Sequence, residues 1–325
     1  MIELKNISKT FKVAKRNAGF KEAFKAFFRR EYEYIHALKN ISFTINDGEM
    51  VGYIGPNGAG KSSTIKVMSG ILNPDSGECI INGKIPWKDR IKHVNEIGVV
   101  FGQRSQLWWD VPVIDSFDLL KDIYNVPVTS FKERLNRLTE AMDIGEIIKT
   151  PVRQLSLGQR MRCEVVAALL HSPKILFLDE PTIGLDAVSK LALREFLRNE
   201  NKQNGVRMIL TTHDMDDIEA LCEKVMVIGR GEILFNGNLV DLKHHFSPLK
   251  QINAVTSSPA ELINIAGAVK IECKDNTFTV WFDPQKVPAQ KIIADIAKQL
   301  PLVDITIKEQ DIDEMIAMMY KEMNL

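Results

Sequence analysis

The stretch GPNGAGKSS has the residue types and the spacing to hold a chain of phosphates. Gly55, Gly60, Lys61 and Ser62 meet the pattern of two glycines separated by four residues, followed by lysine and a hydroxyl residue. Glycines let backbone N–H groups turn inward, lysine brings a cation to the β and γ oxygens, and the hydroxyl can ligate Mg²⁺. The residues predicted to bind the phosphates of a nucleotide are Gly55, Pro56, Asn57, Gly58, Ala59, Gly60, Lys61, Ser62 and Ser63.

Three other expected strands end in residues that suit the same chemistry. The apolar run KILFLDE ends in Asp179 and Glu180. Adjacent residues on a strand point in opposite directions, so one carboxylate can lie near a metal ion and the other near an attacking water. Gln103 follows VVF and His213 follows MILTT, at strand ends where open α/β folds bind ligands. A lone His is more often a core or surface group, and Gln103 alone would mean little.

A second stretch can also hold an anion. In RQLSLGQRM, residues 153–161, Ser156 and Gly158 stand at the start of a helical pattern, where backbone N–H groups lack helical partners. It lies far along the chain from the first phosphate-binding stretch. The chain therefore has two candidate phosphate sites. This raises the question of which nucleotide the second site binds.

The elements that position these residues follow an alternating order. EMVGYIG, EIGVVF, KILFLD and VRMILTT alternate with helical patterns, which predicts βαβ units and a largely parallel sheet in an α/β fold. Residues 104–171 carry helical spacing and are predicted to form a helical subdomain. Residues 12–36 read as an insertion. The pattern changes to short strands and helices after Phe246, so we expect a large domain at 1–246 and a small α+β domain at 247–325.

Composition limits the class of protein. Lys+Arg and Asp+Glu both number 42, so no overall positive field attracts nucleic acid or an anionic membrane. The four cysteines form no CxxC pair, which favours reduced thiols in a cytosol over a disulfide frame or a zinc site. The start MIELKNISKT lacks an apolar signal region, and no run approaches the roughly 18 apolar residues of a membrane span. We expect a cytosolic chain, or one held at a membrane by another protein.

Taken together, the motifs resemble those of an ATP-binding-cassette (ABC) ATPase. GPNGAGKSS, Gln103, LSLGQ, ILFLDEP, GLD at 184–186 and TTHD occur in the order and approximate spacing of that family, over residues 1 to about 240. The resemblance implies a P-loop NTPase fold with an antiparallel β subdomain and a helical signature subdomain. In that family two cassettes pair head to tail, and each ATP lies between one phosphate loop and the partner's signature motif. The second phosphate-binding stretch would thus serve the partner's nucleotide.

The resemblance also implies roles for single residues. Glu180 would be the general base or the water-positioning group, and His213 the γ-phosphate switch. The implied catalytic set is Lys61, Gln103, Glu180 and His213, and the implied Mg²⁺ ligands are Ser62, Gln103 and Asp179. The implied nucleotide contacts outside the phosphate loop are Phe11, Ser156, Gly158, Gln159 and Asp186, with Asp186 acting across the dimer.

Two positions leave questions open at this stage. Phe11 matches the usual place of the aromatic residue that stacks on adenine, but Tyr32 and Tyr34 compete with it. Leu157 departs from the common LSGGQ signature. A residue in the first turn of a helix needs no positive φ, so we expect Leu157 to be accommodated with its side chain pointing away from the phosphate.

The insertion, QLWWD, LSLGQ and the C-terminal domain together resemble the multidrug or antibiotic export branch, with its daunorubicin and viologen exporters. The expected protein is an ATPase that binds ATP and Mg²⁺, pairs with a second copy, and docks on a polytopic permease at the cytoplasmic face of the membrane as a peripheral subunit. Polysaccharide or lipid export is the alternative. A soluble cassette acting in translation or on DNA is disfavoured by the single phosphate loop and the neutral charge.

Two aromatic groups have both a functional and a structural interpretation. Phenylalanines recur at helical spacing within the insertion, with basic residues around them, and predict an amphipathic helix that contacts the permease, contacts the membrane, or packs on the cassette. They are Phe20, Phe24, Phe27 and Phe28. Trp108 and Trp109 either line the groove for the permease or belong to the core.

Overall fold

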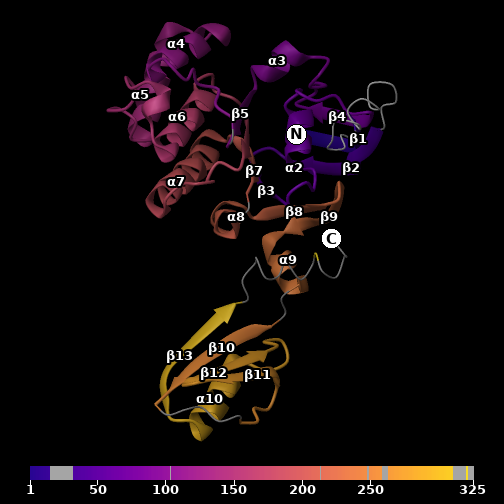
Figure 1. Ribbon diagram of the computed structural model, residues 1–325, viewed down its shortest axis with the longest axis vertical. Coiled ribbons are helices and arrows are strands. Elements are labelled where there is room, and N and C mark those ends of the chain that lie inside the picture. Colours follow the sequence, from indigo (N-terminus) through magenta and orange to yellow (C-terminus); the bar gives the residue numbers. More distant parts are fainter. Residues whose placement is uncertain are drawn as a thin grey trace, which may run out of the picture. The chain divides into compact units, whose positions relative to one another are not determined.

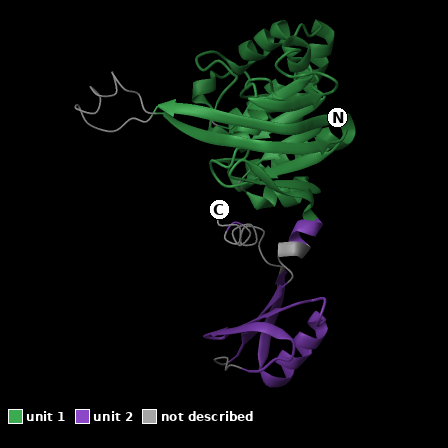
Figure 2. Ribbon diagram, turned by 90° about the vertical axis from the view of Figure 1, so that its right-hand side faces the viewer, with its two compact units in different colours: residues 1–239 green, residues 240–325 purple. Residues whose placement is uncertain are grey.

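The computed structural model describes residues 1–14, 32–102, 104–212, 214–246, 249–257, 263–309 and 320. It divides the chain into two compact units, residues 1–239 and 240–325 (Figure 2). The sequence placed this boundary at 246/247. The difference is helix α9 (Leu239–Phe246), nearly all of which falls in the second unit. Each unit has its own hydrophobic core.

A six-stranded sheet forms the centre of the first unit, with strand order β5-β6-β7-β3-β8-β9 (Figure 1). The strands are β3 (Met50–Ile54), β5 (Ile97–Phe101), β6 (Ile175–Asp179), β7 (Arg207–Thr211), β8 (Lys224–Gly229) and β9 (Glu232–Asn238). All neighbouring pairs are parallel except β8 with β9. Strands covered on both faces read as continuous apolar runs, which is why the buried strands β3, β6, β7 and β8 show little alternation, unlike the partly exposed edge strand β9.

Helices flank this sheet in the chain order that the sequence predicted. They are α2 (Lys61–Met68), α3 (Arg90–Val94), α7 (Ala187–Asn204) and α8 (Met215–Leu221). Because β3, β5, β6 and β7 are parallel, their carboxyl ends meet at one edge of the sheet. The P-loop α/β class expected from the sequence is confirmed.

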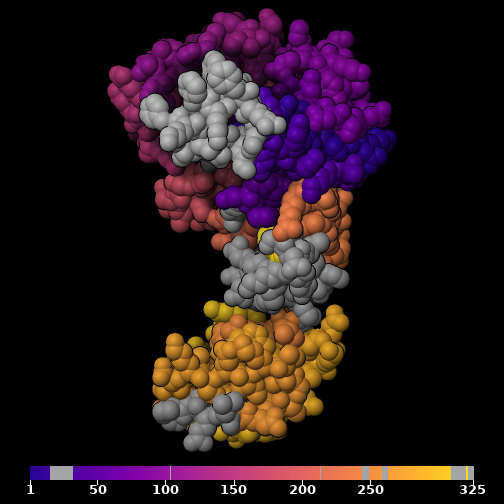
Figure 3. Space-filling model, turned by 45° about the vertical axis from the view of Figure 1, so that its right-hand side comes forward, coloured from indigo at the N-terminus to yellow at the C-terminus, as the bar shows by residue number. Residues whose placement is uncertain are grey.

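A three-stranded antiparallel sheet, with order β2-β1-β4, forms a second layer of this unit. Its strands are β1 (Ile2–Ala14), β2 (Tyr32–Ile45) and β4 (Ser76–Ile81). The β1–β2 ladder runs out to the pair Ala14 and Tyr32, so both ends of the predicted insertion at 12–36 are strand. The phenylalanines of the predicted amphipathic helix lie outside the described residues. In the space-filling view, the indigo β1 region and the magenta helical region occupy different parts of this unit's surface (Figure 3).

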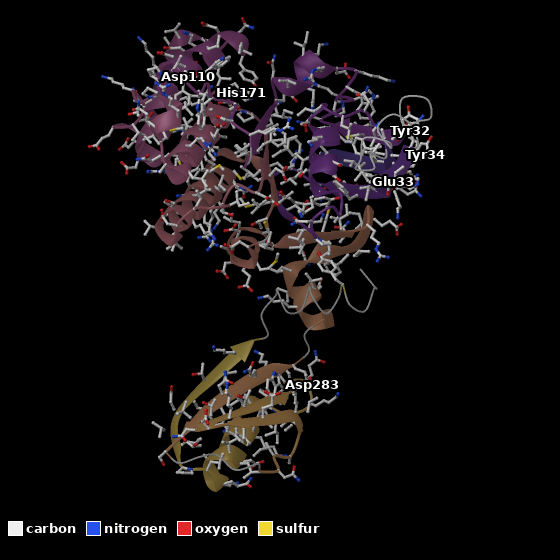
Figure 4. All side chains as sticks on the ribbon, in the orientation of Figure 1. Tyr32, Glu33, Tyr34, Asp110, His171 and Asp283 are labelled. Atoms are coloured by element: carbon white, nitrogen blue, oxygen red, sulfur yellow. The ribbon has the colours of Figure 1, made fainter. Side chains whose placement is uncertain are left out.

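The helical subdomain follows β5 in the chain. It contains α4 (Val113–Ile123), α5 (Val128–Ala141), the short 3₁₀ helix η1 (Val152–Gln154) and α6 (Leu157–Leu169). His171, labelled in Figure 4, follows α6 and joins the subdomain to the sheet. Its Nε2 donates to the carbonyl oxygen of Ile97 at 2.8 Å, and its ring stacks on Tyr124 with centroids 3.9 Å apart.

His171 makes the stability of the first unit sensitive to acid. Burial is the main cause that lowers its pKa from 6.5 to about 4, with a smaller effect of Arg134. The unfolded chain therefore takes up this proton at a higher pH than the folded one, and the neutral ring's contribution is complete above pH 6.5 and lost toward pH 4. We expect the free energy of unfolding of the wild type to fall over this range by up to roughly 3 kcal/mol more than that of His171→Gln. Urea unfolding at several pH values measures the difference, and parallel pH profiles would contradict the assignment.

The second unit is an α+β domain, as expected. Its four-stranded antiparallel sheet has the order β11-β12-β10-β13. Its elements are β10 (Lys250–Thr256), β11 (Ala268–Lys274), β12 (Thr277–Phe282), α10 (Ala289–Gln299) and β13 (Leu302–Glu309). Phe278, Val280 and Phe282 of β12 pack with Ile292 and Ile296 of α10 in the core. The opposite sheet face carries polar side chains, including Asn253, which accepts from Thr279 Oγ1 at 3.0 Å.

Candidate nucleotide site

The phosphate loop connects the end of β3 to the start of α2, and its glycines are required by sterics. A Cβ atom at Gly55 would lie 2.4 Å from the carbonyl oxygen of Ile228. Gly60 has φ 115°, and a Cβ there would lie 2.6 Å from the carbonyl oxygen of Ala37. No other residue type fits at these two positions without moving the backbone. The loop therefore keeps the shape in which its N–H groups and the first turn of α2 can receive phosphate oxygens.

Lys61 folds back across this loop. Its Nζ donates to the carbonyl oxygens of Gly55 at 2.7 Å and Pro56 at 3.2 Å, and only 6% of the residue is exposed. Burial lowers the pKa of Lys61, while the carboxylates of Glu180 and Asp179 oppose that shift. Two carbonyl groups thus hold the ammonium beside the place where the predicted phosphates bind.

Three hydrogen bonds shape the end of β6. Thr211 Oγ1 donates to Asp179 Oδ1 at 2.6 Å, and the Glu180 N–H donates to the Thr211 carbonyl oxygen at 2.9 Å. The Gly102 N–H donates to the Asp179 carbonyl oxygen at 2.8 Å. Glu180 has φ 57°, in the left-handed region that costs a non-glycine residue about 1–3 kcal/mol. The neighbouring strands hold this strained conformation, and strain of this kind is typical of active sites.

These groups surround one cavity of about 610 Å³. Its walls include most of the predicted phosphate loop together with both acidic residues: Asn57, Gly58, Gly60, Lys61, Ser62, Ser63, Asp179 and Glu180. Gln103 and His213 lie outside the described residues, but Gly102 and Arg104, which flank Gln103, both line the cavity. The sequence did not identify Arg104, Ile35 or Ala37 as lining residues. Adjacency to Gln103 was the available signal for Arg104, whereas Ile35 and Ala37 are brought in by the fold of β2.

The β1–β2 ladder separates the three candidate aromatic residues. Phe11 pairs directly with Ile35, which lines the cavity, and directly opposed residues share one face of a sheet. Lys12 Nζ lies 3.9 Å from the ring centroid of Tyr32 and 6.0 Å from that of Tyr34, so both tyrosines share the other face with Lys12. Tyr32 and Tyr34 are labelled in Figure 4. The strand geometry therefore favours Phe11 as the aromatic residue on the cavity side.

The signature stretch forms the start of α6. Ser156 caps the helix, because its Oγ accepts from the Gln159 N–H at 3.2 Å while its own N–H donates to Gln159 Oε1 at 2.9 Å. Of the described residues that line the cavity, none belongs to this stretch. The two candidate phosphate sites of the chain are thus separate.

Leu157 contacts the GLD motif of its own chain. A Cβ atom at Gly184 would lie 2.4 Å from Leu157 Cδ2. Asp186 caps α7, since its Oδ1 accepts from the Ser189 N–H at 2.8 Å. A Cβ atom at Gly158 would in turn lie 3.1 Å from Ser189 Oγ. The leucine that departs from LSGGQ therefore packs on Gly184, and the signature stretch and the GLD motif form one contact region.

Comparisons with known proteins agree with this geometry. Residues 38–183 match the family model described as ABC transporter. The chain is 27% identical over 87% of its length to ABC transporter A family member 1 of Dictyostelium discoideum, and it spans 32% of that protein. It is 33% identical over 63% of its length to the linearmycin resistance ATP-binding protein LnrL of Bacillus subtilis (strain 168), of which it spans 65%. The dimeric post-hydrolysis structure of the ATP-binding cassette MJ0796 with ADP and Pi aligns with a TM-score of 0.62 at 25% identity, covering 74% of this chain and 99% of that one.

A P-loop fold that has a signature helix, and two adjacent acidic residues at the end of a central strand, defines an ABC-type ATPase. The family match over residues 38–183 and the aligned cassettes show that this chain carries an ABC-type ATPase cassette. The identification made from the motifs is confirmed. Among the relatives are proteins named for linearmycin resistance and for probable multidrug transport.

Proposed function

We propose that this chain is the ATP-hydrolysing subunit of a membrane exporter that drives efflux of a drug, an antibiotic or another small molecule through a separate permease. The observation that carries the proposal is the meeting of the phosphate loop, Lys61, Asp179 and Glu180 at one cavity. The names of two relatives support the export branch: the linearmycin resistance protein LnrL, and YbhF of Escherichia coli (strain K12), which is named a probable multidrug ABC transporter ATP-binding protein. ATP would close a dimer of cassettes, and hydrolysis would reopen it.

In this proposal the residues around the cavity have separate roles in ATP hydrolysis. Lys61 exchanges the carbonyl oxygens of Gly55 and Pro56 for phosphate oxygens, and the loop N–H groups bind the remaining charge. Glu180 orients the attacking water and accepts its proton. The left-handed backbone at Glu180 turns its side chain away from the regular direction of a strand residue and provides this separate placement.

The donor set also fits Mg²⁺. Ser62 and Asp179 line the cavity and offer hydroxyl and carboxylate oxygens, the ligands that this hard cation prefers. Thr211 donates to Oδ1 of Asp179 and fixes the orientation of the carboxylate. Bound there with the predicted ligand Gln103, the ion would neutralise charge on the phosphates.

The signature stretch is proposed to act on the nucleotide of a second copy. Ser156 Oγ accepts a hydrogen bond from Gln159, which leaves the hydroxyl hydrogen to donate to a phosphate oxygen. Ser156, Gly158 and Asp186 would contribute to the partner's site, and the MJ0796 cassette is itself described as dimeric. The packing of Leu157 on Gly184 agrees with our expectation that this residue does not obstruct the phosphate.

Trp108 and Trp109 are proposed to bind the permease. Their exposed fractions are 46% and 51%, which disfavours the alternative of core residues. The guanidinium of Arg160 lies 5.9 Å from the ring centroid of Trp109 and helps to hold it. Asp110, next along the chain and labelled in Figure 4, pairs with Arg153 at 3.1 Å. Large exposed aromatic residues on an ordered segment are typical anchors of an interface.

Phe11 is proposed to stack on adenine. Base stacking on an aromatic ring contributes about 1–3 kcal/mol, so we expect Phe11→Ala to weaken ATP binding by about tenfold or more. Tyr34→Ala is the matched control, because Tyr34 lies one register pair away on the other face of the ladder. Its affinity should stay within about twofold of the wild type. Titration with a fluorescent ATP analogue measures both, and the reverse order of effects would contradict the assignment.

The transport role is tested by purifying this chain from detergent-solubilised native membranes and identifying its partners by mass spectrometry. A stoichiometric polytopic partner is expected, which would place the chain at the cytoplasmic face as a peripheral subunit. In the described part of the chain, no helix combines the length and the hydropathy that crossing a membrane requires. Recovery with ribosomes, nucleic acid or soluble partners alone, from material that retains intact membrane complexes, would contradict the exporter proposal.

A further inference from the structure

We propose that Glu164 is a positioning residue that ties the signature helix α6 to the segment after Gln103, so that the two move together when ATP binds. The inference rests on the proposed function, in which Gln103 acts at the chain's own nucleotide and the signature stretch acts at the partner's. Glu164 would then couple the two nucleotide sites of the dimer through one rigid connection.

The connection consists of several hydrogen bonds between α6 and residues 105–106. Ser105 Oγ donates to Glu164 Oε1, and the Gln106 N–H donates to Oε2 at 3.2 Å. In addition, Gln106 Nε2 donates to the main-chain carbonyl oxygen of Glu164 at 3.0 Å. One helical residue therefore binds the segment through both carboxylate oxygens and its main chain. These contacts fix the orientation of residues 105–106 relative to α6 as well as their distance from it.

Burial makes this connection strong. Glu164 is only 3% exposed, and burial is the main cause that raises the pKa of its carboxyl group. Ser105 and Gln106, the donors that contact the carboxylate, are uncharged. A buried carboxylate that loses its donors is strongly destabilised, so the segment cannot separate from α6 without a large cost.

The segment is also anchored on both sides of this connection. Before it, the Gly102 N–H donates to the carbonyl oxygen of Asp179 at the end of β6. After it, the Trp108 N–H donates to Oγ of Ser116, a buried residue of α4. In chain order, the residue before position 103 is thus anchored on the acidic strand end, and residues 105–106 after it are anchored on the signature helix through Glu164.

The position of Glu164 along α6 supports a coupling role. It lies two helical turns after the capping residue Ser156, and an α-helix transmits displacement along its axis because its backbone hydrogen bonds are continuous. A shift of residues 105–106 that follows nucleotide binding would therefore move Ser156 and Gly158 as well. Such a shift would orient the signature stretch toward the partner's phosphate.

The test uses the full chain with Glu164→Ala and Glu164→Gln. Glu200→Ala is the matched control, because Glu200 is also a buried carboxylate, at 4% exposure, that connects the helical subdomain to the core through Arg137. Its carboxylate accepts from Arg137 and from Asn204 of its own helix. Thermal unfolding, ATP affinity, and kcat and KM are measured for every variant. Hydrogen exchange is followed with and without Mg²⁺ and ATP in peptides that cover residues 104–110 and 155–163.

For Glu164→Ala we expect kcat to fall by about tenfold or more while ATP affinity and KM stay within about threefold of the wild type. Glu164→Gln keeps one acceptor oxygen and should restore part of the rate. In hydrogen exchange, ATP should still protect residues 104–110 in Glu164→Ala but should no longer change residues 155–163. Glu200→Ala should be less stable than the wild type, but ATP should still change the hydrogen exchange of both peptides in this variant.

Three results would overturn the coupling role. The first is an unchanged kcat in Glu164→Ala. The second is a fall in kcat in Glu200→Ala that equals the fall in Glu164→Ala when the two variants lose the same stability. The third is hydrogen exchange of residues 155–163 that still responds to ATP in Glu164→Ala. A failure of the proposed function can be distinguished from a failure of the coupling role, because it would appear in the wild-type protein. Wild-type protein that shows the exchange response to ATP without turnover would contradict the hydrolytic role and leave the coupling supported. Wild-type protein that does not bind ATP would contradict both.

Discussion

Replacing Glu180 with glutamine is expected to leave ATP binding within about threefold of the wild type and to lower turnover by about 100-fold or more. Glutamine has the size of glutamate but cannot accept a proton from water at neutral pH. The backbone bonds that hold position 180, from its N–H to Thr211, do not involve the side chain and remain. Binding and hydrolysis should therefore separate in this variant.

The same variant should accumulate as an ATP-bound dimer, because closure precedes the step that is blocked. Steady-state phosphate release measures the turnover, and size-exclusion chromatography with Mg²⁺ and ATP measures the dimer. Glu195→Gln, on the exposed side of α7, is the matched control and should behave as the wild type. Near-normal turnover in Glu180→Gln would remove Glu180 from the catalytic role, whichever dimer is observed.

The second large effect is expected for Lys61→Ala, which should weaken ATP binding by roughly 30-fold or more and abolish measurable hydrolysis. The ammonium is the buried cation of the phosphate loop, and its contacts with Gly55 and Pro56 show that it reaches across the loop. Without it, the phosphates lose a charge-assisted hydrogen bond in a partly desolvated site. The loop backbone, fixed by the contacts of Gly55 and Gly60, should keep its shape.

Stability provides an independent check on Lys61→Ala. Burial lowers the pKa of Lys61, so the charged form is disfavoured in the folded protein, and its removal should not lower the unfolding midpoint substantially. Lys92→Ala, at an exposed position of α3, controls for loss of a positive charge and should bind ATP as the wild type does. Unchanged ATP affinity in a folded Lys61→Ala protein would contradict the assigned phosphate site.

Local sequence determined the class of this protein and the parts of its phosphate site that are contiguous in the chain. The loop from Gly55 to Ser63 depends on glycines at fixed spacing, and Asp179 and Glu180 stand at the end of an apolar run. Such features are encoded within a few residues. Because parallel strands end at one edge of a sheet, the meeting of these groups could also be predicted from the alternating pattern.

The sequence could not choose among Phe11, Tyr32 and Tyr34, because the face of each residue depends on the register between β1 and β2. Nor could it show that Leu157 packs on Gly184. It also did not reveal Glu164, which reads as one more polar residue in an amphipathic helix. Its partners Ser105 and Gln106 lie 59 and 58 residues away in the chain, respectively. Register, side-chain packing and buried hydrogen bonds of this kind depend on residues distant in sequence, and only the tertiary structure brings them together.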